Sequence, residues 1–162
     1  MTDGFVVILM GSKADLEHSQ TIAEALRTFG LEAVLRIGSA HKTPEHTLEI
    51  LQQYEADPRP KVFITVAGRS NALSGFTDAS VSAPVIACPP PNEAFGGGDI
   101  FSSLRMPSGV APALVLEPVN AALLAAKILG LKDPDIQTRV VSYQKQMADK
   151  VIESDAALRA KE

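Results

Sequence analysis

The stretch Phe5-Val6-Val7-Ile8-Leu9-Met10 decides the fold class of this chain of 162 residues. Its apolar residues do not alternate with polar ones, which is typical of a strand buried on both faces of a parallel sheet. Small and polar residues follow directly at Gly11–Asp15, so we expect the strand to end in a tight loop. This pattern predicts a sheet with helices on both of its faces.

Similar apolar runs recur along the chain and alternate with amphipathic stretches. The further predicted strands are Ala33–Ile37, Val62–Val66, Pro84–Cys88 and Ala113–Leu116. Strand–helix units in succession indicate parallel strands joined by right-handed crossovers. The predicted fold class is therefore α/β: a three-layer α/β/α sandwich with a flavodoxin-like, doubly wound parallel sheet of five strands and an extra C-terminal helix.

Periodic spacing places the helices between these strands. Gly30 is a natural C-terminal cap for the first helix, and Thr43-Pro44 joins an N-cap residue to a proline at the first position of the second. A later helix is predicted over Val119–Leu129. The side chains expected to face the sheet from the first two helices are Ile22, Leu26, Phe29, Leu48 and Leu51.

Two segments depart from this pattern. Residues 89–98 begin with three prolines and end with three glycines. They fit either a surface excursion or, as we favour, a lid over a site. Residues 133–160 predict a last helix, which can cover its own domain or, as we favour, dock on a second subunit. Its apolar stripe consists of Ile136, Val140, Tyr143, Met147 and Val151. We predict one domain over residues 1–162, with its core at about residues 4–131.

Composition argues against several classes of protein. The formal net charge of -4 and the isoelectric point near 5.4 disfavour nucleic acid or an anionic membrane as the partner. The single cysteine, Cys88, excludes a disulfide within one chain, and its place at a strand end indicates a core residue rather than a nucleophile. No basic stretch precedes Phe5–Met10, and this run is too short to span a bilayer, so we expect a cytoplasmic protein.

The loops after the first three strands hold the candidate site residues, because ligands bind outside the carboxyl ends of strands in an open parallel sheet. Gly11 and Gly68 allow a ligand to approach the backbone closely, and Lys42 or Arg69 would neutralise a phosphate. Serines beside helix N-termini also suit a phosphate, although each alone would fit an ordinary turn or cap. These are Ser12, Ser39 and Ser70. Neither a Walker loop nor a GxGxxG motif supports an ATP or dinucleotide site.

His41 is the candidate for proton transfer. A histidine just before a helix is often structural, but His41 lies between two possible ligand contacts at a strand end. Asp15 fits a carboxylate favoured by the helix dipole, an acceptor for a ribose hydroxyl, or both. His18 and His46 fall at helical positions and are interpreted as solvated or structural. Because the histidines are scattered without matched carboxylates, we expect no metal site.

Two of these loops resemble those of a known family. Met10–Asp15 and Ser39–Pro44 are similar to the signature loops of the 5-aminoimidazole ribonucleotide (AIR) carboxylase and mutase family, and the similarity extends to about Leu129. One class of this family rearranges N5-carboxyaminoimidazole ribonucleotide. The other class makes the same carbon-carboxylated product directly from AIR and carbon dioxide. The resemblance implies an enzyme of purine biosynthesis.

Further segments resemble the direct carboxylase, class II of the family. They are Val66–Gly75, Ala87–Pro91 and Ser102–Gly109. The mutase class typically has His-Leu-Pro-Gly where this chain has Ala72-Leu73-Ser74-Gly75, and it usually has arginine at the position of Lys42. The resemblance therefore implies ATP-independent carboxylation of AIR, with the mutase as the nearest alternative. A remote alternative is a non-catalytic flavodoxin-like module that binds phosphate or a flavin, although aromatic residues are few and the acidic phosphoacceptor cluster is missing.

The resemblance also implies roles for the site residues. His41 matches the proton-transfer histidine of the family. The residues implied to bind substrate are Gly11, Ser12, Asp15, Ser39, Lys42, Ala67, Gly68, Arg69 and Ser70. The first three would hold the ribose-phosphate end, Ser39 and Lys42 would reach it from the second loop, and the last four would line the pocket for the base and carbon dioxide. No cofactor and no metal is implied, and a homo-oligomer (a tetramer or octamer) with sites near subunit interfaces is expected.

Overall fold

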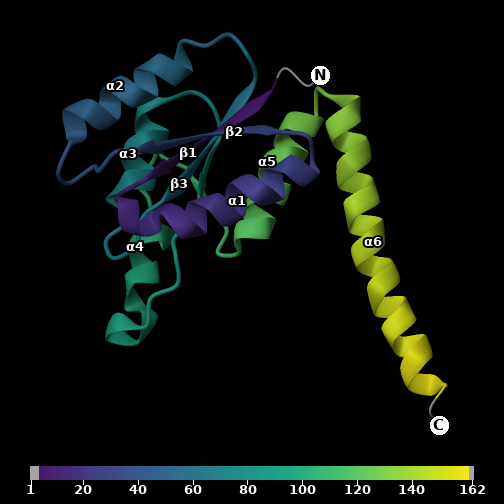
Figure 1. Ribbon diagram of the computed structural model, residues 1–162. Helices are drawn as coiled ribbons and strands as arrows, with labels where there is room; N and C mark the ends of the chain where they lie inside the picture. Colours follow the sequence, from purple (N-terminus) through teal and green to yellow (C-terminus); the bar gives the residue numbers. More distant parts are fainter. Residues whose placement is uncertain (1–3, 161–162) are drawn as a thin grey trace.

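The computed structural model describes residues 4–160, with a parallel sheet at its centre (Figure 1). The strands are β1 (Phe5–Met10), β2 (Glu32–Ile37), β3 (Lys61–Val66), β4 (Val85–Ala87) and β5 (Ala113–Leu114). They pair in the order β2-β1-β3-β4-β5, and every pairing is parallel. This is the strand order of the flavodoxin-like class, so the predicted fold class is confirmed.

Helices cover both faces of the sheet. On one face lie α1 (Leu16–Thr28), which follows the short 3₁₀ turn η1 (Lys13–Asp15), and α5 (Pro118–Gly130). On the other face lie α2 (Pro44–Glu55) and α3 (Ala72–Ser80). The carboxyl ends of the strands therefore open between two helical layers, at the edge where the predicted site residues lie.

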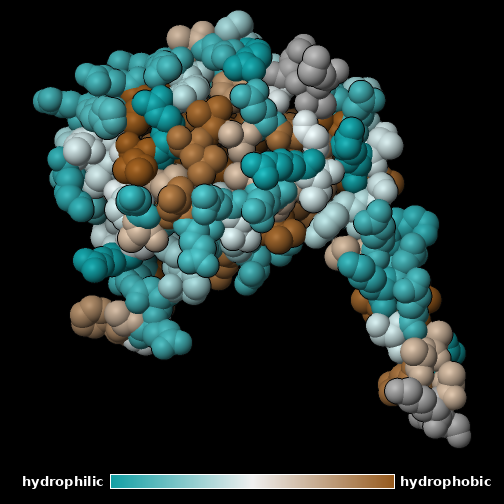
Figure 2. All heavy atoms as spheres, viewed as in Figure 1, coloured by the Kyte–Doolittle hydropathy of each residue, from teal (hydrophilic) through white to brown (hydrophobic). Residues whose placement is uncertain are grey.

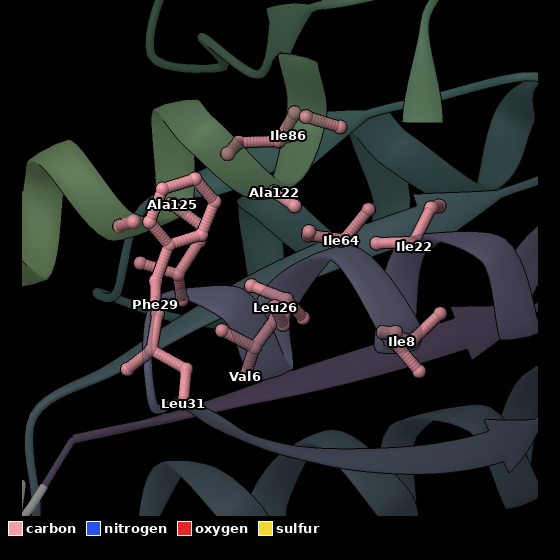
Figure 3. Close-up of a cluster of buried hydrophobic side chains, with 14 of the residues drawn as sticks. Val6, Ile8, Ile22, Leu26, Phe29, Leu31, Ile64, Ile86, Ala122 and Ala125 are labelled. Carbon is pink, nitrogen blue, oxygen red and sulfur yellow. The ribbon is translucent and has the colours of Figure 1, made fainter. Parts of the chain in front are cut away.

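Strand β1 explains the uninterrupted apolar run of the sequence. All six of its residues are buried, and successive side chains point to opposite faces of the sheet. Val6, Ile8 and Met10 pack toward α1 and α5, where Figure 3 shows Val6 and Ile8 among residues of both helices. Phe5, Val7 and Leu9 pack toward α2 and α3. Both faces of β1 are shielded from solvent because each is covered by its own pair of helices.

The predicted helix ends are largely confirmed. Gly30 has a φ of 73° and its amide donates to the carbonyl of Arg27 at 3.0 Å, as expected of a left-handed C-terminal cap. Thr43 and Pro44 occupy the N-cap and first positions of α2. The prediction for Leu48 is wrong, because this side chain is 38% exposed. The buried face of α2 instead contains Thr47, Ile50 and Leu51, and Leu48 lies beside that stripe.

The last two strands are shorter than predicted. Strand β4 begins after Pro84, which has no amide hydrogen to donate to the ladder, and ends before Cys88. Strand β5 ends at Leu114, although the Val115 amide still donates to the carbonyl of Ala87 at 2.9 Å. Leu116 is exposed because the chain there turns away toward Pro118, where α5 begins.

Residues 94–104 form an arm that extends away from the sheet (Figure 1). It consists of the 3₁₀ segment η2 (Ala94–Ile100) and the short helix α4 (Phe101–Leu104). Phe95, Gly96 and Gly97 all have positive φ, and the Phe95 side chain is 94% exposed. The predicted lid segment, residues 89–98, thus leads into this arm, and its closure over a site stays a prediction.

Helix α6 (Pro134–Arg159) lies against the domain only at its beginning. Ile136 and Val140 are buried, and Tyr143 meets the ring of Phe29 edge-on with centroids 5.3 Å apart. Farther along the predicted stripe, Val151 is 70% exposed. Figure 2 shows further hydrophobic patches on this projecting half. In the first turns of α6, the apolar stripe therefore packs against the rest of the chain. Farther along the helix, the stripe is exposed. Within residues 4–160, no helix is both long and apolar enough to cross a membrane.

Candidate active site

A cavity of about 520 Å³ lies at the carboxyl ends of β1, β2 and β3. The structure brings every predicted site residue to its wall: Gly11, Ser12, Asp15, Ser39, His41, Lys42, Ala67, Gly68, Arg69 and Ser70. Sequence reasoning missed Ala14, Ala40 and Leu73, which also line it. These are apolar residues with no chemical signature, so only the fold could reveal their position.

The first loop is held by its own carboxylate. Asp15 accepts hydrogen bonds from the amide and from the hydroxyl of Ser12, each at 3.1 Å. The Gly11 amide donates to the carbonyl of Val66 at 2.9 Å, which ties this loop to the end of β3. Because both of these hydrogen bonds use one carboxylate oxygen, Oδ2, the other oxygen can accept from a ligand hydroxyl. The structural and the binding interpretations of Asp15 are therefore compatible.

The second loop is a tight turn with His41 at its apex. The Thr43 amide donates to the carbonyl of Ser39 at 2.9 Å, and the Ser39 amide donates to the Thr43 hydroxyl at 3.0 Å. The Ser39 hydroxyl accepts from the Lys42 amide at 3.2 Å, which leaves its own proton free for a ligand. His41 and Lys42 are exposed at the rim. Lys42 forms no ion pair with any residue from 4 to 160, so its ammonium group is available to an anion.

The third loop places a cation on the cavity wall. Ala67 is buried at the end of β3, and Gly68 lies where a Cβ atom would come within 3.4 Å of the Pro90 ring. Arg69 has a φ of 59°, in the left-handed region that non-glycine residues seldom adopt. Its guanidinium forms no ion pair within the described part of the chain. Within residues 4–160, the cavity wall thus carries two cations that form no ion pair, Lys42 on the loop after β2 and Arg69 on the loop after β3.

A second cavity of about 590 Å³ shares Ala67, Gly68 and Arg69 with the first. His18 lies on its wall and donates from Nε2 to the carbonyl of Cys88 at 3.1 Å. Burial lowers the pKa of His18 below its ordinary value, against the opposing effects of the hydrogen bond to Cys88 and of nearby Asp15 and Glu117. The neutral imidazole therefore acts as a fixed hydrogen-bond donor, in line with its interpretation as structural.

Cys88 lies beside His18 although 70 residues separate them in the chain. Its Sγ is 3.4 Å from the Nε2 atom of His18. Burial, assisted by the negative charge of Glu117, raises the pKa of the Cys88 thiol to about 12. A thiol that stays protonated at neutral pH is a poor nucleophile, so proximity to a histidine does not make this cysteine a catalytic candidate. Among residues 4–160, no three histidine, cysteine, aspartate or glutamate side chains are grouped as metal ligands.

The sequence profile of the family described as AIR carboxylase matches residues 5–150. The chain belongs to the AIR carboxylase family. A phosphoribosylaminoimidazole carboxylase of Treponema denticola is 59% identical over 154 residues, covering 95% of this chain and 97% of that protein. A protein of the same name from Archaeoglobus fulgidus is 58% identical over 153 residues, covering 94% of this chain and 84% of that one. The family predicted from the loops is confirmed.

Structural similarity to the AIR carboxylase family extends over almost the whole chain. The crystal structure of Treponema denticola PurE superimposes with a TM-score of 0.94 at 59% identity, covering 96% of this chain and 98% of that one. The human bifunctional phosphoribosylaminoimidazole carboxylase/phosphoribosylaminoimidazole succinocarboxamide synthetase is 47% identical over 128 residues. That match covers 79% of this chain but only 30% of the human protein, so the family domain also occurs as part of a larger enzyme.

Proposed function

We propose that this member of the AIR carboxylase family attaches carbon dioxide to carbon 4 of AIR without consuming ATP. The observation that carries the proposal is the single cavity on which His41, Lys42, Arg69 and Asp15 converge. Two relatives matched over 97% and 84% of their own length, at 59% and 58% identity, are named phosphoribosylaminoimidazole carboxylases, which supports direct carboxylation over the mutase reaction.

The third loop gives a second reason to favour the carboxylase over the mutase. Where the mutase class has His-Leu-Pro-Gly, this chain has Ala72–Gly75 at the start of α3, with Leu73 on the cavity wall. Among the described residues, His41 is the one histidine that lines this cavity. The site therefore offers one imidazole for proton transfer, and the second histidine of the mutase motif has no counterpart.

The substrate is held at its phosphate and ribose by the first two loops. Lys42 supplies a positive charge and Ser39 a free hydroxyl proton, which together suit the phosphate. The backbone of Gly11 and the hydroxyl of Ser12 lie nearby on the first loop. Asp15 accepts a ribose hydroxyl through the carboxylate oxygen that its own loop does not use. This arrangement leaves the imidazole base to extend toward Ala67–Ser70.

The chemistry needs positioning more than activation. AIR is an enamine, so its carbon 4 is already nucleophilic, whereas carbon dioxide is electrophilic but offers little to grip. A new carbon–carbon bond forms as carbon 4 attacks carbon dioxide. The resulting intermediate carries both the new carboxylate and a hydrogen on carbon 4. His41 removes that proton, the C–H electron pair restores aromaticity, and the carboxylate stays on the ring. Confinement against the wall formed by Ala67, Gly68 and Leu73 also limits water.

Arg69 compensates the negative charge that develops on the new carboxylate. The backbone amide of Asn71 cannot share this task, because it donates to the Ser102 hydroxyl at 2.9 Å. Residues 89–98 would close over the site as a lid, with the glycines of η2 as the flexible part. No step in this sequence requires a cofactor or a metal ion.

The protein further acts as one cytoplasmic catalytic domain that assembles into a homo-oligomer, a tetramer or octamer. Support comes from the uncovered apolar residues of α6 and of the arm, including Val151, Ile152 and Phe101. Apolar patches of this kind mark contacts between subunits.

Parallel reactions with the two candidate substrates test the proposed function. One reaction contains AIR and a source of carbon dioxide; the other contains N5-carboxyaminoimidazole ribonucleotide, corrected for its spontaneous breakdown. Formation of the carboxylated imidazole is followed by ultraviolet absorbance. We expect turnover in the first reaction alone. Turnover in the second alone would make the chain a mutase, and turnover in neither would leave a binding protein.

A further inference from the structure

The backbone of the third loop adopts a conformation that its own sequence does not favour. Within residues 4–160, Arg69 and Phe95 are the only non-glycine residues with positive φ. Phe95 lies on the exposed arm, but Arg69 lies on the wall of the proposed active site. Unfavourable backbone conformations persist only where the surrounding structure leaves the chain no alternative. Some feature of the fold must therefore hold Arg69.

Asn71 provides this restraint through both its backbone and its side chain. It is only 3% exposed. Its backbone amide donates to the Ser102 hydroxyl at 2.9 Å, and its side-chain Nδ2 donates to the Ser103 hydroxyl at 2.8 Å. Its Oδ1 accepts from the Ser74 amide at 3.2 Å, which caps the start of α3. Asn71 thus joins the third loop to α3 on one side and to α4 on the other.

Ser102 completes the connection to the arm. Its hydroxyl donates to the carbonyl of Asp99 at 2.7 Å and lies 3.4 Å from the carbonyl of Arg69. Two residues before Arg69, Ala67 is buried directly after the end of β3. Arg69 is therefore bounded on one side by β3 and on the other by the hydrogen-bonded Asn71. Asn71 and Ser103 are both buried, so breaking the bond between them leaves a buried polar group unpaired, which favours a single conformation of this loop.

We propose that Asn71, together with Ser103 and Ser102 of α4, is a positioning residue that holds Arg69 in its left-handed conformation and so places the guanidinium on the active-site wall. Asn71 lines the second cavity but not the first, so it acts on the proposed reaction through Arg69, which lines both. This inference rests on the proposed function, in which Arg69 compensates the new carboxylate. Because that charge develops during the reaction, misplacing the guanidinium lowers kcat more than it changes the KM for AIR.

Removal of the Ser103 hydroxyl tests the network without touching the site or the cap of α3. The wild-type chain is assayed first for carboxylation of AIR, since an inactive wild type would refute the proposed function itself. We then expect Ser103→Ala to lower kcat per folded molecule about 10-fold or more, with the KM for AIR changed less than about 3-fold. Ser103→Thr, which keeps the hydroxyl, should retain most of the wild-type kcat.

A double-variant cycle separates positioning from a general effect on stability. If Ser103 acts through Arg69, Ser103→Ala should lower kcat by less than about 2-fold in an Arg69→Gln background. Equal fold-changes in the two backgrounds, or a normal kcat in Ser103→Ala, would overturn the inference. Ser80→Ala is the matched control, because it removes a hydroxyl that bonds the Phe76 carbonyl at the far end of α3. Should Ser103→Ala fail to fold, Ser102→Ala at the exposed neighbouring position tests the same link.

Discussion

His41 stands at the apex of the Ser39–Thr43 turn, exposed at the rim of the cavity and outside ion-pair distance of any carboxylate within residues 4–160. His46 lies five residues farther on, in α2, with its Nδ1 atom 3.8 Å from Glu49. The two histidines thus share a segment but not a cavity. This difference makes His46 a suitable control for the proposed role of His41.

His41→Asn should abolish most of the turnover while leaving binding nearly intact. We expect kcat to fall about 100- to 10,000-fold, the usual contribution of a positioned general base. The dissociation constant for AIR, measured by calorimetry, should change only a few-fold because the phosphate and ribose contacts come from other residues. His46→Asn should keep wild-type kcat. A His41→Asn enzyme that remains active would contradict the assignment.

The buried imidazole of His18 should make stability depend on pH. Its pKa is lowered in the folded state, so between the unfolded value of 6.5 and the folded value the unfolded chain binds a proton that the folded chain does not. The free energy of unfolding should therefore decrease as the pH falls from about 7.5 to about 5.5. Urea unfolding at several pH values should show a smaller decrease in His18→Gln. An identical slope in both proteins would show that His18 is not linked to folding.

That the candidate residues meet at one cavity was predictable from the sequence, but how they are held there was not. Gly11, Ser39 and Arg69 follow β1, β2 and β3, and parallel strands end at one edge, so their convergence is a consequence of topology. The contact between His18 of α1 and Cys88, which follows β4, spans 70 residues of the chain and leaves no local pattern. The bond from Asn71 to Ser103 likewise depends on where the arm lies.

At the level of elements, the second loop depends on close packing beneath it. Gly38 is buried between β2 and α2, and a Cβ atom added there would come within 2.8 Å of the Thr47 hydroxyl oxygen. That hydroxyl donates to the carbonyl of Thr43 at 2.8 Å, so displacing it disturbs the turn that carries His41. The glycine is thus required by proximity rather than by backbone conformation.

Gly38→Ala should destabilise the protein by about 1–3 kcal/mol, the range for an extra methyl group in a packed interior. Urea denaturation measures the change. Gly98→Ala is the matched control, since no heavy atom lies within 4 Å of the added Cβ and the position has no positive φ. Its free energy of unfolding should stay near the wild-type value. Equal stability of the two variants would mean that the loop adapts to the methyl group.

Element boundaries followed the sequence wherever local chemistry determined them. The backbone preference of Gly30 ends one helix, and those of Thr43 and Pro44 begin the next. Strand β1 is recognisable because both of its faces are buried. Leu48 was misplaced because Thr47, a polar residue, takes the buried position that an apolar residue usually occupies. The end of β5 was overestimated because apolar residues continue to Leu116 after pairing stops.

At the scale of the whole molecule, the second half of α6 is largely exposed among residues 4–160. Its first turns pack on α5 and against Phe29, whereas Val151 and Ile152 are exposed on the part that extends from the body (Figure 1). The sequence showed one stripe along this helix but not the point at which it leaves the domain. That point depends on the length of α5 and on the position of Phe29, neither of which the α6 segment encodes.

Val151→Asp should weaken assembly without unfolding the domain, because the side chain is exposed in the single chain but would be buried between subunits. Sedimentation velocity should show a shift toward smaller species, while circular dichroism stays unchanged. Ser142→Asp introduces the same charge two and a half helical turns away, on the opposite face of α6, and should leave the assembly intact. An unchanged oligomer in Val151→Asp would place the subunit contact elsewhere.

The reaction itself is tested most directly with isotopically labelled carbon dioxide. The wild-type chain is mixed with AIR and freshly dissolved labelled carbon dioxide, without ATP, and the early product is examined by mass spectrometry. We expect the label in the carboxylate of the carboxylated imidazole from the first turnovers, at a rate that depends on the enzyme concentration. Absence of labelled product under these conditions, with folded protein and intact AIR, would contradict direct carboxylation.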